Sequence, residues 1–169
     1  MGVSILIPVE EYLRTSYDPD RDFIDGQTLE RNVGKKRHSF AQISIGSWLF
    51  QRRASLQIEP FTEQRLRISA RRVRIPDILI MKAPSSDEAV FTTPPYVCIE
   101  LMSPDDTMSS LQERMDDYMG FGVDNVWVID PWTERAWNVT STGWHAALDG
   151  ILRTSDARIK MPLADVLLP

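Results

Sequence analysis

The chain has 169 residues, 43% of them hydrophobic and 25% charged, with one cysteine and a formal net charge of −5. A chain of this length builds a hydrophobic core without disulfides or structural zinc, and the lone cysteine excludes an internal disulfide, a zinc ribbon and a CxxC redox site. The sequence has no signal peptide and no apolar run of about 18 residues, so we expect a single cytoplasmic domain over residues 1–169 with no membrane partner.

Charge is unevenly distributed along the sequence. Residues 31–74 hold eleven basic and two acidic side chains, whereas residues 1–30 and 75–169 are both acidic on balance. This asymmetry predicts that one face of the protein meets an anionic partner. The alternative is a solvated helix face together with an edge strand protected by arginines.

The first third of the chain predicts two helices and a hairpin. Pro8 marks the start of a short helix at residues 9–15, and Asp25-Gly26 is a turn signal inside a hairpin at residues 23–29. A long helix is expected at residues 38–53, because apolar residues recur there with helical spacing: Phe40, Ile43, Ile45, Trp48 and Leu49.

The remainder predicts strands around one further helix. Three extended runs are expected, at residues 56–66 or 56–69 (interrupted by Pro60), 73–81 and 96–102, with a polar loop at residues 83–95. The last two runs are apolar on both faces, as in central strands. A helix at residues 108–119 and a buried strand at residues 125–130 follow. The C-terminal part predicts short strands and a final helical turn, at residues 136–140, 143–148, 158–161 and 163–168.

Two carboxylates interrupt the apolar central strands. Asp77 follows Pro76, which predicts a bend or bulge, and Glu100 lies within a run of aliphatic residues. Burying an ionised carboxylate is costly unless a cation compensates it, and a shared Mg²⁺ would stabilise both acids. In the alternative, each acid lies at a strand end, exposed or paired with its own arginine, and the charge argument for a shared metal ion fails.

These residues belong to a longer pattern that resembles a known family. The pattern comprises Ile24-Asp25-Gly26 with Glu30, His38 at a helix start, and residues 73–77, 99–104 and 126–131. It is similar to the Uma-type family of putative restriction endonucleases, in the PD-(D/E)XK nuclease superfamily, over about residues 20–131. The resemblance implies an α/β (α+β) fold with a restriction-endonuclease-like αβββαβ core, in which helices flank a mixed central sheet, plus an N-terminal hairpin and short C-terminal strands.

The resemblance also implies candidate catalytic residues. Asp77 and Glu100 would be the ligands of Mg²⁺ (or Mn²⁺), with Glu30 and His38 as supporting residues. The superfamily lysine two residues after the glutamate is Met102 here, and the helical position at which the family offers a lysine is Arg114. Arginine stays protonated, so Arg114 can stabilise charge on a phosphate but cannot act as a general base.

The function that follows is a metal-dependent endonuclease hydrolysing DNA phosphodiester bonds, with no organic cofactor and with a homodimer as a possible assembly. Basic residues of the middle segment would bind backbone phosphates without reading sequence: Lys35, Lys36, Arg65, Arg67, Arg71, Arg72 and Arg74. Two alternatives remain. One is a nucleic-acid-binding module that has lost catalysis, and the other is an oligomeric interaction protein whose basic segment contacts acidic surfaces of its own chain.

Overall fold

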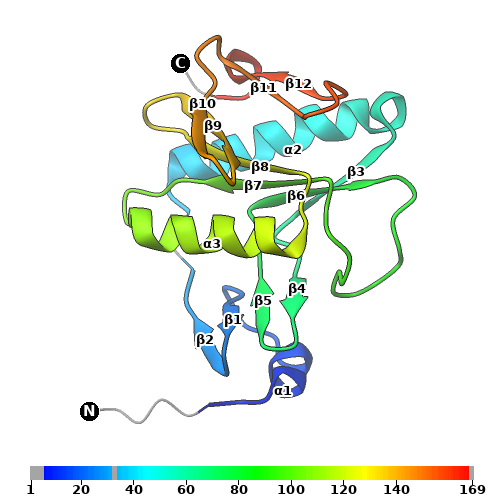
Figure 1. The fold of residues 1–169 in the computed structure, drawn as a ribbon, viewed down its shortest axis with the longest axis vertical. Coiled ribbons are helices and arrows are strands. Elements are labelled where there is room, and N and C mark those ends of the chain that lie inside the picture. The colour runs from blue at the N-terminus through cyan, green and yellow to red at the C-terminus, as the bar shows by residue number, and fades with distance from the viewer. Residues whose placement is uncertain (1–5, 32–33, 168–169) are drawn as a thin grey trace.

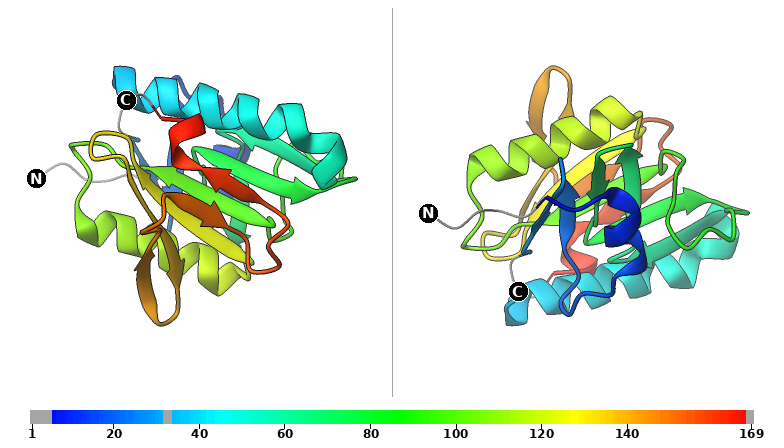
Figure 2. Two further views of the ribbon diagram at one scale, coloured as in Figure 1. Left: turned by 90° about the horizontal axis from the view of Figure 1, so that it is seen from above. Right: turned by 90° about the horizontal axis from the view of Figure 1, so that it is seen from below.

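The computed structural model describes residues 6–31 and 34–167. Its centre is a six-stranded sheet that lies between two helices, α2 (Lys36–Leu56) and α3 (Met108–Phe121), one on each face (Figures 1 and 2). The strand order is β10-β9-β8-β7-β6-β3. These strands are β3 (Ile58–Thr62), β6 (Ile78–Lys82), β7 (Val97–Leu101), β8 (Asn125–Asp130), β9 (Arg135–Thr140) and β10 (Gly143–Ala146).

The predicted αβββαβ core is confirmed by α2, β3, β6, β7, α3 and β8 in that order. Strands β3, β6 and β7 pair antiparallel, whereas β7 and β8 pair parallel. A parallel pair needs a crossover between its strands, and α3 supplies it. The sheet is therefore mixed, as expected.

Alternating residues of the central strands face the two helices. Ile78, Ile80 and Ile99 pack in the cluster that contains Ile45 and Leu49 of α2. Leu79 and Cys98 pack instead with Met115 and Tyr118 of α3, in a separate cluster on the opposite face. Because side chains of a strand alternate between its faces, Glu100 is on the α3 side of β7, like Cys98.

A second sheet projects below α3 in Figure 1 and packs against α1 (Val9–Arg14). Its strand order is β2-β1-β5-β4, with bounds Gln27–Leu29, Asp22–Ile24, Arg72–Arg74 and Leu66–Ser69. The predicted hairpin is β1 and β2, and its turn residues Asp25 and Gly26 have φ values of 50° and 91°. These positive values explain the Asp-Gly dipeptide.

Two predicted strands are wrong in their extent. The run at residues 73–81 is divided into β5 of the small sheet and β6 of the large one, because Pro76 between them has no N–H for a ladder. The run at residues 56–69 is β3 and β4, and α2 itself continues to Leu56. Pro60 stays inside β3 because β3 is an edge strand, which tolerates a missing donor.

The C-terminal region adds a two-stranded sheet, β11 (Ile151–Arg153) with β12 (Lys160–Pro162), and a short 3-10 helix at Leu163–Asp165. The sequence did not predict β11, and residue 168 of the predicted final turn lies outside the described residues. In the part of the chain that the structure describes, no helix combines the length and apolarity needed to cross a bilayer.

Candidate functional site

Asp77 lies where the ladder between β6 and β7 ends. The last register pair joins Ile78 to Ile99, the chain neighbours of Asp77 and Glu100. The register therefore places the two acids at neighbouring positions of adjacent strands. Beyond the last pair, the backbone N–H of Leu101 donates to Asp77 Oδ2 at 2.8 Å. The carboxylate therefore takes the place of the backbone carbonyl that would accept this hydrogen bond in a continuing ladder.

Two cationic side chains meet the buried Asp77 carboxylate. Arg31 Nη2 donates to Oδ1 at 2.9 Å, and His38 Nε2 lies 3.4 Å from Oδ2. Burial raises the pKa of Asp77, but the contacts with His38, Arg31 and Leu101 lower it by more, so the net shift is downward. Asp77 is therefore ionised at neutral pH. Burial lowers the pKa of His38, and the contact with Asp77 raises it above its ordinary value.

Glu100 is buried against α3. Tyr118 Oη donates to Glu100 Oε1 at 2.5 Å, and Arg114 Nη1 lies 3.2 Å from Oε2. Burial raises the pKa of Glu100 to about 7, although the charge of Arg114 opposes this shift and that of Asp77 adds to it. The two acids thus have opposite shifts despite similar burial.

Arg114 is fixed by two acids. Besides Glu100, it donates to Asp106 Oδ1 at 2.8 Å, and Asp106 Oδ2 accepts the N–H of Ser103 at 2.7 Å. Arg114 and Tyr118 are four residues apart on α3, which places them on one face of the helix. One face of α3 therefore holds both the guanidinium and the hydroxyl against Glu100.

The alternative in which each acid pairs with its own arginine is the arrangement that the structure shows. Each carboxylate has its own guanidinium, Arg31 for Asp77 and Arg114 for Glu100. The partners also come from opposite faces of the sheet, because His38 belongs to α2 and Tyr118 to α3. Each acid therefore has a cationic partner within the chain, so burial of the two acids alone gives no reason to expect a bound metal ion.

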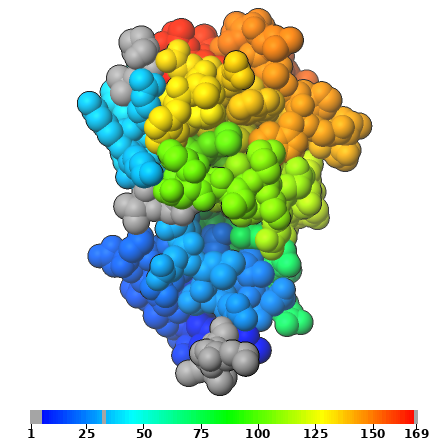
Figure 3. All heavy atoms as spheres, turned by 90° about the vertical axis from the view of Figure 1, so that its left-hand side faces the viewer, coloured from blue at the N-terminus to red at the C-terminus, as the bar shows by residue number. Residues whose placement is uncertain are grey.

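A cavity of about 310 Å³ opens beside Asp77, and its lining is Asp18, Pro19, Arg31, Gly34, His38, Ser39, Gln42, Glu63 and Asp77. Gln42 Nε2 donates to the backbone carbonyl of Asp77 at 3.1 Å. Glu30, Glu100 and Arg114 do not line this cavity. In Figure 3 the N-terminal segment (blue) lies below the first turns of α2 (cyan).

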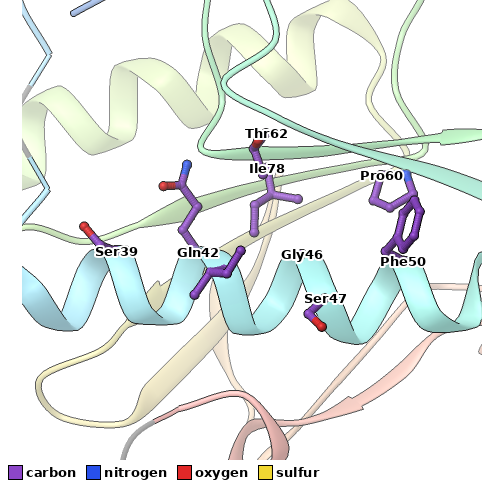
Figure 4. A pocket seen from close by; sticks show the side chains of 9 residues that line it. Ser39, Gln42, Gly46, Ser47, Phe50, Pro60, Thr62 and Ile78 are labelled. Atoms are coloured by element: carbon purple, nitrogen blue, oxygen red, sulfur yellow. The ribbon is translucent and has the colours of Figure 1, made fainter.

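A shallow groove of about 430 Å³ continues from this cavity along α2, since Ser39 and Gln42 line both. In Figure 4, Ser39 and Gln42 lie at one end of the groove, and Phe50 and Pro60 lie together at the other. Ile43 and Phe50 are large exposed apolar side chains. The cavity beside Asp77 therefore opens into an elongated surface depression.

The fold does not place Glu30 beside the other candidate catalytic residues. Its side chain is 79% exposed and pairs with Arg21 at 3.1 Å. The resemblance implied that His38 and Glu30 both support the site, and the structure places only the His38 ring against Asp77. His38 Nδ1 is buried without a hydrogen-bond partner among the described residues.

Several of the arginines expected to bind phosphates form internal ion pairs. Arg74 is buried, with Nη1 2.9 Å from Asp22 and Nε 2.7 Å from Asp117. Arg72 also pairs with Asp117, at 2.6 Å, and Arg65 pairs with Asp20 at 2.6 Å. A phosphate would have to displace these carboxylates, so the guanidiniums of Arg65, Arg72 and Arg74 serve the fold in this structure.

The other basic candidates are nearer to solvent. Lys35 makes an exposed pair with Asp105 at 3.2 Å, and Lys36 is exposed beside it at the start of α2. Arg71 is 73% exposed and lies 3.3 Å from Asp25, while Arg67 is 4.0 Å from Glu10. Lys35 and Lys36 flank the helix terminus that carries His38.

Sequence reasoning missed Arg31 and Tyr118 as site residues. Arg31 was counted within the basic segment, and nothing local links it to Asp77, 46 positions further along. Tyr118 lies within the helix predicted at residues 108–119, where a tyrosine by itself does not indicate a site. The one available signal was its spacing of four from Arg114, which puts both side chains on the same helix face.

An αβββαβ core with two acids at the end of adjacent strands defines the class of restriction-endonuclease-like proteins. The chain belongs to the Uma2 family, described as "Putative restriction endonuclease", whose family model matches residues 9–157. This confirms the family resemblance seen in the sequence.

The fold is similar to that of a solved crystal structure. A crystal structure of a putative nuclease belonging to DUF820, from Anabaena variabilis ATCC 29413, has a TM-score of 0.81 and 18% sequence identity, covering 95% of this chain and 97% of that chain. A cryo-EM structure of the DrdV–DNA complex has a TM-score of 0.44 and 15% identity, covering 66% of this chain and 10% of that one. A comparison with curated proteins finds no match.

The donor chemistry at Asp77 and Glu100 fits a hard divalent cation. Within residues 6–31 and 34–167, no three His, Cys, Asp or Glu side chains gather in a metal-binding group. Two carboxylates are a sufficient donor set, because Mg²⁺ commonly binds one or two carboxylates while keeping several waters.

Proposed function

We propose that this protein is a metal-dependent endonuclease that hydrolyses DNA phosphodiester bonds at Asp77 and Glu100, using Mg²⁺ or Mn²⁺. The observation that carries the proposal is the placement of two buried carboxylates at neighbouring positions of adjacent strands. Membership of a restriction endonuclease family supports the reaction class. In this proposal the enzyme acts on DNA in the cytoplasm.

Asp77 and Glu100 would hold the divalent ion, which would supply Lewis-acid activation of the phosphate. The chain's own groups do the rest. Arg114 places a permanent positive charge beside Glu100, where it stabilises charge developing on the phosphate, and Tyr118 orients Glu100 by donating to Oε1. His38 holds a proton at Nε2 toward Asp77.

Lys35 and Lys36 are the basic residues that we propose for backbone phosphate contacts near the site, with Arg71 as a more distant contact. Their exposure at the start of α2 supports this assignment. Such contacts make binding salt-dependent and insensitive to sequence. Cutting both strands of a duplex needs two sites, so we propose a homodimer as the active assembly.

A nuclease assay with matched variants tests the proposal. We expect the wild-type chain to cleave plasmid DNA with Mn²⁺ or Mg²⁺, and Asp77→Asn or Glu100→Gln to lose about 10²-fold or more of that rate while still binding DNA. Asp87→Asn, on an exposed loop, is the matched control and should cleave like wild type. Glu30→Gln tests the remaining acid, and its exposed position predicts a smaller loss.

One observation favours a second candidate, a nucleic-acid-binding module without catalysis. Both carboxylates are already neutralised by arginines, and Met102 occupies the place of the superfamily lysine. The same assay separates the two functions. DNA binding at low salt without cleavage in either metal, unchanged by Asp77→Asn, would overturn the nuclease proposal in favour of this one.

A further inference from the structure

The two arginines of the site differ in how firmly they are held. Arg114 contacts both Glu100 and Asp106, so it retains one ion pair if the other is broken. Within the described part of the chain, Asp77 is the one ion-pair partner of Arg31. Arg31 also lines the cavity beside Asp77, whereas Arg114 does not. Of the two guanidiniums, that of Arg31 therefore has one ion-pair partner among the described residues and lies next to a cavity.

The two oxygens of Asp77 are not equally available. Oδ2 accepts the Leu101 N–H at 2.8 Å and faces His38 Nε2 at 3.4 Å. Oδ1 accepts from Arg31 at 2.9 Å. A carboxylate oxygen offers about two lone-pair directions, so Oδ2 is fully used by the strand end and the histidine. A cation that binds Asp77 must therefore approach Oδ1, where it meets the positive charge of Arg31 at hydrogen-bond distance.

A displaced Arg31 has a destination on the same cavity wall. Glu63 lines the cavity, its carboxylate is held by Gln42 Nε2 at 3.3 Å, and Gln42 also binds the backbone of Asp77. The guanidinium can thus exchange one carboxylate for another without leaving the cavity. Such an exchange keeps the positive charge of Arg31 within the site.

We propose that Arg31 is a displaceable counterion of Asp77, which holds Oδ1 in the metal-free protein and competes directly with a divalent cation for that atom. The inference rests on the proposed function and adds a residue that sets metal affinity. Arg31 is a positioning residue in this role, because it acts on the metal through Asp77.

Calorimetric titration of the DNA-free protein with Mn²⁺ tests this role. We expect Arg31→Met to bind Mn²⁺ about tenfold or more tightly than wild type, because the competing charge is gone. Arg31→Lys retains the charge and should stay within about threefold of wild type. Asp77→Asn, added to Arg31→Met, should abolish the tighter binding.

The matched control is Arg153→Met, which removes an exposed arginine from an Asp149 pair of similar length, 2.8 Å. It should bind Mn²⁺ like wild type. Thermal unfolding gives a second readout. Without metal, Arg31→Met should melt below wild type since Asp77 loses its counterion, and saturating Mn²⁺ should raise its Tm by more than that of wild type.

Equal or weaker Mn²⁺ binding by folded Arg31→Met overturns the inference. If wild type cleaves DNA in that case, the proposed function stands and only the role of Arg31 is lost. If Arg31→Met binds Mn²⁺ more tightly but wild type never cleaves DNA, the counterion role stands and the nuclease proposal fails. Absence of Mn²⁺ binding in both proteins, without cleavage, overturns both.

Discussion

Asp77 and Glu100 show how the surroundings of a buried carboxylate decide its protonation. Asp77 gains a backbone N–H, an arginine and a histidine, and the net shift of its pKa is downward. Glu100 is enclosed by the apolar face of α3, where burial raises its pKa to about 7 despite Arg114. The metal-free site therefore holds one firmly ionised acid and one that gains a proton near neutrality.

Asp156 gives a pH prediction away from the site. Its pKa is lowered to about 2 by the Tyr96 hydroxyl, the backbone N–H of Arg158 and the Thr154 hydroxyl. A depressed folded-state pKa contributes stability that is present above the unfolded value of about 4 and is lost as pH falls toward 2. We therefore expect Asp156→Asn to melt below wild type at pH 7 and the difference in Tm to shrink between pH 4 and pH 2.

Thermal unfolding of both proteins from pH 7 to pH 2 measures this difference. Tyr96→Phe removes the largest cause of the shift and should raise the pH at which stability is lost. A Tm difference between Asp156→Asn and wild type that is constant across this range would contradict the prediction.

At the scale of elements, α3 positions Arg114 and Tyr118, and its N-terminus is fixed by a capping box. Thr107 Oγ1 accepts the N–H of Ser110 at 3.1 Å, while Ser110 Oγ accepts the N–H of Thr107 at 3.3 Å. We expect Thr107→Ala to lower the free energy of unfolding by about 1 kcal/mol, because α3 loses the side-chain hydrogen bond of its N-cap.

Urea denaturation checks this value. Ser109→Ala is the matched control, since Ser109 is exposed in the same turn and takes no part in the capping box. It should change stability by less than about 0.5 kcal/mol. Equal losses for the two variants would show that the cap does not hold the start of α3.

At the scale of the whole molecule, an ion-pair cluster joins the small sheet to α3. Arg74 of β5 binds Asp22 of β1 and Asp117 of α3, and only 4% of its side chain is exposed. Removing one partner of a buried pair leaves uncompensated charges. We expect Arg74→Met to lower the free energy of unfolding by about 3–5 kcal/mol.

Arg71→Met is the control in the same region, because its side chain is 73% exposed, and it should cost about 0–1 kcal/mol. Urea unfolding followed by circular dichroism and by tryptophan fluorescence measures both variants. Coincident transitions for wild type are expected from the single-domain prediction. Similar losses for the two variants would mean that the cluster does not link the sheet to the helix.

The sequence by itself determined the order of the core elements, the family, and the two acids within apolar strands. These follow from local information, because helical and strand periodicity and the Pro76-Asp77 break are written in neighbouring residues. The division of residues 73–81 between two sheets was harder to predict from the sequence. A proline indicates where a strand ladder is interrupted, but not with which strands the residues on either side pair.

Only the tertiary structure decided the partners of each charge. Arg31 reaches Asp77 across 46 positions and Arg74 reaches Asp117 across 43, and no local pattern selects one acid among many. An ion pair forms where folding brings two groups out of water together, so its strength and its choice of partner depend on burial that periodicity alone does not fix. For that reason the sequence identified the basic segment, whereas the tertiary structure showed which of its arginines form internal ion pairs and which one contacts Asp77.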